Sequence, residues 1–299
     1  MANTNFQAAF AGFVSSTATS LFFPLETIKV HLMVSDGRSA NHTPHYSGSF
    51  HVLKELYKEG GVGRLYRGWY LTSANSFSWA VYFYLYHWGK ATLPGLLGPD
   101  HHEIEKFLVA FQASVLTTVA VNPAMVMKTR IMLLKYPQRW YQDLHDSALK
   151  IWKLEGVKGF YTGLSPAMVL SLNGTLHLYF YETLKEGFNP EGTNQKTTLI
   201  GAVSKLLSSA LMHPMQTIKY RMQQEQHSAY ILTPSKQLQA HRPSEKPLFG
   251  SVWDCAVTTW RHEGVKGFYR GLAVNQMRLF PANGLFFLIY ENVLKACRS

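Results

Sequence analysis

The sequence predicts an all-α membrane protein with six transmembrane helices in three tandem repeats, each repeat carrying one short helix between its two spans. Three observations support this fold class: a proline motif that recurs three times, a glycine motif that follows each copy, and apolar segments of about 20 residues, the length that a bilayer requires. The composition agrees, because 46% of residues are hydrophobic and 14% aromatic whereas only 16% are charged, a low charge content for a soluble domain.

The proline motif closes an apolar run in each third of the chain. Its copies are FPLETIKVH at 23–31, NPAMVMKTR at 122–130 and HPMQTIKYR at 213–221. Proline normally breaks a helix, but a membrane helix tolerates it where neighbouring helices or water satisfy the freed carbonyl. We therefore expect the first, third and fifth helices to be kinked at Pro24, Pro123 and Pro214.

The glycine motif follows each proline motif. It has the forms GGVGRLYRG, EGVKGFYTG and EGVKGFYRG, and it ends at Gly68, Gly163 and Gly271. A short segment with helical spacing precedes it and a second apolar run follows it, so each third contains the same elements in the same order. We place the repeats at 1–98, 99–193 and 194–299, and interpret the polar insert at about 225–247 as a loop.

The predicted spans are six apolar runs, at 6–33, 70–90, 105–134, 164–185, 197–223 and 272–295. Small and polar residues gather in the odd-numbered runs, which suits helices that pack closely around a polar cavity. The alternative is a soluble array of helical repeats, but long and almost uncharged apolar runs would be difficult to keep in solution.

Other classes of protein fit less well. The two cysteines, Cys255 and Cys297, support neither a disulfide framework nor a metal site, and no nucleophile–base set or phosphate loop indicates an enzyme. A net charge of +11 suits an anionic membrane surface, an anionic substrate or a nucleic acid. We disfavour nucleic acid because the basic residues fall within the repeated motifs. The start of the chain lacks a basic region, so any targeting signal is expected to be internal.

The two motifs resemble the signature of the mitochondrial carrier family: Pro-x-acid-x-x-base-x-base, then acid-Gly, aromatic, base and Gly after some tens of residues. The resemblance covers essentially the whole chain, three times over. It implies threefold pseudosymmetry around one central site, short helices on the matrix side, location in the mitochondrial inner membrane, and transport by alternating access. It also implies that helices beginning at Gly68, Gly163 and Gly271 bind cardiolipin through free amides. No other cofactor is expected.

The resemblance further implies a matrix gate, in which the acid of one repeat pairs with the first base of the next. Glu26 has such a partner in Lys128. Met125 and Gln216 stand at the other two acidic positions, so two lysines lack carboxylate partners, although Gln216 can hydrogen-bond one of them. The expected matrix gate therefore consists of Glu26, Lys29, Lys128, Gln216 and Lys219.

A cytoplasmic gate is implied at the other end of the helices. Glu291 can meet Lys90, but His87 stands where an acid would face Lys185, and Glu182 finds an apolar residue at its expected basic partner. One full ion pair therefore remains at each gate, which argues against a symmetric, tightly latched carrier.

Three further departures concern the motifs themselves. Gly60 replaces the acid before Gly61, Thr162 replaces the base before Gly163, and His31 replaces the second base of the first proline motif. We interpret these changes as ordinary drift at positions on the surface or behind the site.

The predicted substrate is an anionic, ring-containing cofactor or nucleotide such as FAD or folate. The apolar and amide residues at the second and third acidic positions resemble the subgroup of carriers for pyrimidine nucleotides, NAD, FAD and folate. VSDGR at 34–38, SWAVYFYLY at 78–86 and VSKLL at 203–207 look most like the folate and flavin carriers. That subgroup usually has tryptophan where this chain has Met125, so the chain is a divergent member.

Two cations are the main substrate-binding candidates. Arg278 lies within the last apolar run, and its planar guanidinium suits a bidentate grip on phosphate or carboxylate; the alternative is that it reaches toward lipid headgroups. Lys205 lies near mid-helix, where a cation is costly and indicates function, unless backbone carbonyls hold it. By the family's spacing, Ala74 and Val169 line the same site as an apolar wall. Possible hydrogen-bonding residues, which could equally cross-link helices, are Asn75, Gln112 and Asn173.

A structural role is the main alternative to transport. In that view the chain is a former carrier that now braces a larger inner-membrane complex. The missing gate carboxylates and the long third loop favour the brace, whereas Arg278 and Lys205 favour a carrier. The expected partners are a small anionic substrate and cardiolipin, with no nucleic acid.

Overall fold

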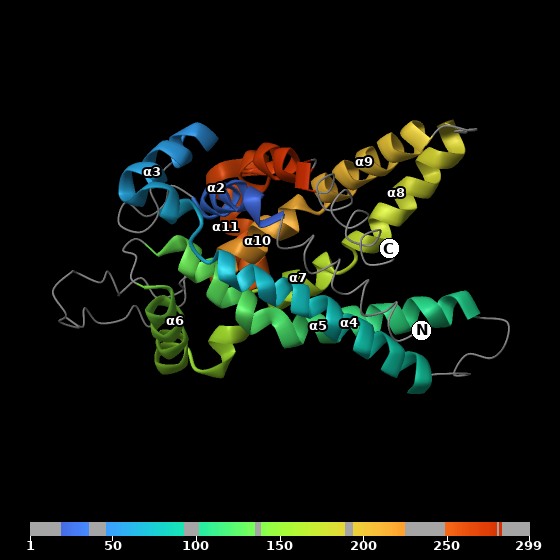
Figure 1. The fold of residues 1–299 in the computed structure, drawn as a ribbon, viewed down its shortest axis with the longest axis horizontal. Coiled ribbons are helices and arrows are strands. Elements are labelled where there is room, and N and C mark those ends of the chain that lie inside the picture. The colour runs from blue at the N-terminus through green and yellow to red at the C-terminus, as the bar shows by residue number, and fades with distance from the viewer. Residues whose placement is uncertain are drawn as a thin grey trace, which may run out of the picture.

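The computed structural model describes residues 19–35, 46–92, 102–134, 139–188, 194–224, 249–279 and 281–282. All regular secondary structure within these segments is helical. Three helices that carry the proline motifs, α2, α5 and α10, contact one another at the centre of the molecule (Figure 1). The end of the bundle where these motifs lie is called the motif end below.

The first repeat contains η1 (Thr19–Phe22), α2 (Phe23–Val34), α3 (Ser49–Leu65), η2 (Trp69–Leu71) and α4 (Thr72–Thr92). The second contains α5 (His102–Leu133), α6 (Trp140–Leu154), η4 (Val157–Tyr161), α7 (Leu164–Leu170) and α8 (Asn173–Phe188). The third contains α9 (Asn194–Leu211), α10 (His213–Gln223) and α11 (Val252–Phe268), followed by helical residues 272–279. The short helices α3, α6 and α11 correspond to one another.

One of the three motif prolines differs from the other two in its place within the helix. Pro123 lies inside the continuous helix α5, whereas Pro24 and Pro214 stand in the first turns of α2 and α10. Proline suits that place because the first amides of a helix have no intrahelical partner to lose. The predicted run 197–223 is therefore two helices, α9 and α10, separated at Met212.

The run 164–185 is also divided, into α7 and α8, a break that the sequence pattern did not indicate. At the break the Ser171 hydroxyl donates to the Met168 carbonyl at 2.6 Å. This side-chain bond competes with continuation of the helix.

The glycine turns of the three repeats have the same backbone conformation, which accounts for the glycines in their sequence. Gly61, Gly156 and Gly264 have φ between 61° and 65°, a conformation that residues with a side chain rarely adopt. The later glycines also pack closely on the next repeat: a Cβ on Gly163 would lie 3.1 Å from the Lys219 carbonyl oxygen, and one on Gly271 would lie 3.2 Å from that of Lys29. These glycines thus allow the repeats to approach one another.

The short helices bury one face against the proline helices. In α3 the buried residues Val52 and Leu56 pack with Ile28 and Leu32 of α2, and Cys255 of α11 packs with Ile218 of α10. In Figure 1, the pairs α4–α5 and α8–α9 extend to the right, away from α3 and α6 at the left. The apolar cores therefore lie at the motif end.

One described helical stretch, Leu108–Leu133, is long and apolar enough to cross a membrane, with a mean hydropathy of 1.4. A shorter apolar helix, Leu199–Leu211, lies in the third repeat. The other predicted spans do not meet this measure within the described residues, so the number of six spans remains a prediction.

Candidate functional site

Charged side chains from all three repeats meet between the proline helices. We call them the basal cluster: Glu26, Lys29, Lys128, Lys219 and Arg278. The three lysines each lie five residues after the motif proline, so convergence of α2, α5 and α10 brings them together. Each of these four cations interacts electrostatically with the Glu26 carboxylate or with another member of the cluster.

The Glu26 carboxylate is shared between two cations. Lys128 Nζ lies 2.9 Å from Glu26 Oε1, and Arg278 Nη1 lies 3.8 Å from Oε2. The predicted pair of Glu26 with Lys128 is therefore present. Arg278, which the sequence placed only in the substrate site, also touches the gate.

The side chains in direct contact with the other two lysines are neutral. Lys29 Nζ donates to Asn275 Oδ1 at 3.3 Å, not to Gln216 as the sequence suggested, and Asn275 is held in turn by Ser209. Within the described segments Lys219 has no carboxylate partner. Both ammonium groups lie near the Tyr220 ring, 5.2 Å from its centroid for Lys29 and 5.9 Å for Lys219. Sequence reasoning missed Asn275 and Tyr220; the available signal was that Tyr220 directly follows Lys219 and that Asn275 stands three residues before Arg278.

The cluster is therefore short of negative charge. Four cations surround one carboxylate among the described residues, and Lys29 and Lys128 are only 4% and 7% exposed. Burying a charge costs several kcal/mol unless it is paired. Such a cluster is suited to bind an anion.

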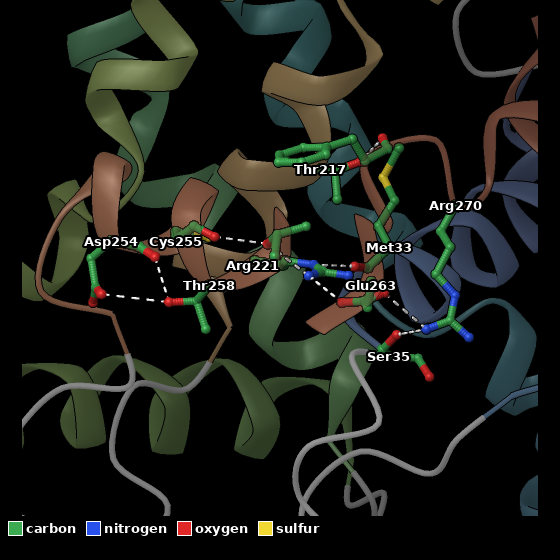
Figure 2. A network of polar contacts seen from close by, with 11 residues as sticks. Met33, Ser35, Thr217, Arg221, Asp254, Cys255, Thr258, Glu263 and Arg270 are labelled. Carbon is green, nitrogen blue, oxygen red and sulfur yellow. Dashed lines mark hydrogen bonds and ion pairs between the residues drawn. The ribbon is translucent and has the colours of Figure 1, made fainter. Parts of the chain in front are cut away.

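The interface between the third and first repeats is closed by a guanidinium network, shown in Figure 2. Arg221, which is fully buried, lies 2.6 Å from Glu263 of its own repeat and donates through Nε to the Met33 carbonyl of α2 at 2.9 Å. Arg270 also approaches Glu263, at 3.2 Å, and donates to the Ser35 carbonyl. Both arginines thereby cap the carboxyl end of α2, where carbonyls lack helical partners.

The interface between the second and third repeats uses the same device once. Arg130 forms a bidentate pair with Glu155, at 2.7 and 2.8 Å, and donates to the Gln223 carbonyl at the end of α10 at 3.2 Å. Thr162 stands where Arg270 stands in the third repeat, and its hydroxyl donates to Gly159 of its own repeat instead.

At the interface between the first and second repeats, the equivalent carbonyl is that of Met132, and it is contacted by residues at different motif positions. His31 occupies the position of Arg130 and Arg221, and its Nε2 lies 3.1 Å from the Met132 carbonyl oxygen. Arg64, from the glycine motif, donates to that same oxygen at 2.9 Å and pairs with Glu59 at 3.3 Å. In the first repeat, the arginine that donates to this carbonyl therefore belongs to the glycine motif, whereas in the other two repeats it belongs to the proline motif.

The sequence changes in the first repeat form one compensated set. Arg64 stands where the other repeats have Gly159 and Gly267, and a Cβ at either glycine would lie only 2.6 Å from the Cβ of Glu155 or Glu263. Gly60 removes that glutamate in the first repeat and leaves room for Arg64. Gly60 itself is exposed, as expected for a surface position, whereas His31 is buried against the Met132 carbonyl and takes part in this contact.

A second guanidinium strengthens this interface. Arg67 pairs with Asp143 of α6 at 2.8 Å and donates to the Leu134 carbonyl at 3.1 Å, the counterpart of Arg270 with Ser35. At the interface between the third and first repeats, where Arg270 donates to Ser35, burial raises the pKa of the Tyr46 hydroxyl to about 12. Tyr46 is therefore neutral at physiological pH. Within the described residues, two interfaces thus have two arginines each and the interface between repeats two and three has one.

The opposite end of the bundle has no ion pair among its described residues. Lys90, Glu182 and Lys185 are exposed, and Lys185 Nζ lies 6.0 Å from the Tyr181 ring centroid. Glu291 lies outside the described residues. The geometry is thus closed by ion pairs at the motif end, whereas the residues described at the other end form none.

The remaining substrate candidates lie between the two ends. Lys205 on α9 is half-buried, and His177 of α8 interacts with it electrostatically while its Nε2 lies 3.3 Å from the Gly201 carbonyl oxygen. Asn173 has a buried Oδ1 with no partner in the described part of the chain. Val169 is exposed and Gln112 half-buried, and the side chains of Ala74 and Asn75 lie outside the described residues.

Three helical repeats that converge on a cation-rich cluster and are closed at one end define a membrane solute carrier. The chain belongs to the mitochondrial carrier family: the family profile described as "Mitochondrial carrier protein" matches residues 2–96, 100–192 and 190–298.

Several curated relatives align along nearly the whole chain. The chain is 28% identical over 320 residues to Folate transporter 1, chloroplastic, of Arabidopsis thaliana, covering 100% of this chain and 97% of that protein. It is 28% identical to the mitochondrial nicotinamide adenine dinucleotide transporter 1 of Saccharomyces cerevisiae, covering 96% and 75%. It is also 28% identical to the mitochondrial FAD carrier protein of the same yeast, covering 93% and 92%. These relatives are named as transporters, not enzymes.

Proposed function

We infer that this protein transports an anionic, ring-containing cofactor or nucleotide, of the type of FAD or folate, across the mitochondrial inner membrane. The basal cluster is the observation that carries the proposal, because four buried or half-buried cations around one carboxylate favour an anionic substrate. The names of the three relatives agree in kind, since folate, NAD and FAD are all anionic ring compounds.

The proposal includes six transmembrane helices and alternating access. The motif end faces the matrix, so the described geometry corresponds to a carrier closed toward the matrix and open toward the cytoplasm. Opening toward the matrix then requires the pair of Glu26 with Lys128 to break, together with arginine contacts between repeats. The mitochondrial location follows the family and two of the three relatives; the third is named as chloroplastic.

The central residues have assigned roles in this mechanism. Arg278 and Lys205 supply charge contacts to the substrate, while the apolar Ala74 and Val169 face its ring. Asn75, Gln112 and Asn173 supply hydrogen bonds. Cardiolipin binds at the amides that follow Gly68, Gly163 and Gly271, where helix N-termini favour phosphate.

The second candidate function is a structural brace in a larger inner-membrane complex. Met125 and Gln216 favour it, because they remove two carboxylates of the expected matrix gate. A structural brace binds no substrate, so none of these compounds would raise its Tm.

One experiment separates the two functions. The purified full-length protein is reconstituted in cardiolipin-containing liposomes and tested for uptake of FAD, folate and NAD, with thermal unfolding measured alongside. A ligand at about 100 times its dissociation constant stabilises the folded state by roughly 2.7 kcal/mol. Uptake together with a raised Tm supports transport. No uptake, a flat Tm across the panel and fixed-ratio recovery in a membrane complex after mild extraction support the brace.

A further inference from the structure

We propose that Lys29 and Lys219 form a binding site for two oxyanion groups of the substrate, which take the place of the carboxylates that Gln216 and Met125 do not supply. The inference rests on the proposed transport function and names a site for the charged end of its substrate. It assigns these two lysines to recognition as well as to the gate.

The threefold arrangement places two positions without carboxylates opposite these lysines. Glu26 lies two residues after its proline and reaches Lys128 of the next repeat at 2.9 Å. Met125 and Gln216 occupy the same position after their own prolines. By the same geometry Met125 faces Lys219 and Gln216 faces Lys29, so each lysine has a vacant place for negative charge.

The two ammonium groups are within reach of one ligand. Both lie near the ring of Tyr220, at 5.2 and 5.9 Å from its centroid, and they interact electrostatically with each other. Lys29 uses one donor on Asn275 and keeps the remaining donors of its ammonium group. The Lys219 ammonium group has no hydrogen bond or ion pair within the described part of the chain.

Within the described part of the chain, Glu26 is the one carboxylate that acts on these two lysines. Glu26 is already paired with Lys128 and Arg278, and although it also attracts Lys29 and Lys219, Lys29 is repelled by Lys128, Lys219 and Arg278, and Lys219 by Lys128. A buried cation among like charges is unfavourable unless a counter-charge reaches it. Among the described residues no second carboxylate is placed to do so, which leaves the substrate as its source.

The ligand chemistry follows from two adjacent ammonium groups beside an arginine. It requires two oxyanion groups on one molecule, either a pyrophosphate or a pair of carboxylates. FAD and NAD carry a pyrophosphate, and folate carries a pair of carboxylates. The cluster by itself therefore favours a molecule with two oxyanion groups of either kind. A neutral or singly charged molecule leaves one lysine unpaired.

The sharpest test supplies the missing carboxylates. The double variant Met125→Glu/Gln216→Glu is compared with the neutral control Met125→Leu/Gln216→Met. Thermal unfolding is measured without ligand and with FAD, folate or inorganic pyrophosphate. We expect the acidic variant to melt higher than wild type without ligand and to lose at least half of the ligand-induced shift in Tm. The neutral control should keep the shift.

Two lysine variants still test the proposal if the acidic double variant fails to fold. Lys29→Gln and Lys219→Gln are each expected to weaken binding of the same probe about tenfold or more, since each loses a charge-assisted contact. Exposed Lys153→Gln, on the outer face of α6, serves as the matched control and should bind normally. Full ligand-induced shifts in the acidic double variant, or unchanged binding in both lysine variants, would overturn the proposal, as would the absence of any shift in wild type.

The anion site and the transport function can be confirmed or contradicted independently of each other. A pyrophosphate-induced shift that depends on Lys29 and Lys219, without uptake of any compound, supports the anion site and contradicts transport. Uptake of FAD or folate that is indifferent to both lysines supports transport and overturns the site.

Discussion

Arg64 donates a hydrogen bond at 2.9 Å to the carbonyl oxygen of Met132, and thereby does for the first repeat what Arg130 and Arg221 do for the other two. Every proline helix ends in a carbonyl that accepts from an arginine of the preceding repeat. The equivalence holds in space although Arg64 has no counterpart arginine at its position in sequence. The contact between repeats, and not the motif residue, is therefore what the three repeats share.

Arg64→Ala should destabilise the protein by about 1–3 kcal/mol, because the Met132 carbonyl loses a charge-assisted bond in a buried place. Thermal unfolding of purified protein measures this. The matched rescue transplants the pattern of the other repeats as His31→Arg/Gly60→Glu/Arg64→Gly and should recover most of the loss. A triple variant no more stable than Arg64→Ala would contradict the compensation.

Arg221→Met should destabilise by about 3–5 kcal/mol, because it leaves Glu263 buried beside a single remaining partner, Arg270. The double variant Arg221→Met/Glu263→Gln should be less damaged than this single variant, since no uncompensated carboxylate remains. Denaturant or thermal unfolding checks both. Additive losses in the double variant would indicate that the two residues do not act as a pair.

Glu26→Gln should lower the Tm and weaken closure at the matrix end, because Lys128 and Arg278 both lose their carboxylate. The exposed Glu182→Gln, which makes no ion pair among the described residues, is the control and should change the Tm little. Accessibility of a cysteine placed near the motif end reports closure. A silent Glu26→Gln together with an impaired Gln216→Ala would refute this assignment.

Arg278→Lys should retain part of the uptake, and Arg278→Ala should abolish it without unfolding the protein. Lysine keeps the charge near Glu26 but loses the planar fork that grips an oxyanion at two points. Uptake into liposomes and the Tm of each variant are measured together. Normal uptake by Arg278→Ala would remove this residue from the site.

Much of the architecture was available in the sequence. The repetition of the proline and glycine motifs predicted three equivalent helical units, and the resemblance to the carrier signature implied the contact of Glu26 with Lys128 across 102 positions. The glycines of the turns were predictable for the same reason, since left-handed backbone and close approach both require the absence of a side chain. These features are local or repeat with the chain, so a sequence records them directly.

The tertiary structure decided which departures from the repeat mattered. His31, Gly60 and Arg64 look like unrelated drift along the chain, because nothing in sequence links a missing glutamate to an arginine four residues later and a histidine in another helix. Packing links them through one carbonyl, that of Met132. The partners of Lys29 were hidden in the same way, since Asn275 and Tyr220 reach it only when α2, α10 and the last helix converge. A sequence fixes which charges exist, but the balance among buried charges depends on distances that only the folded chain sets.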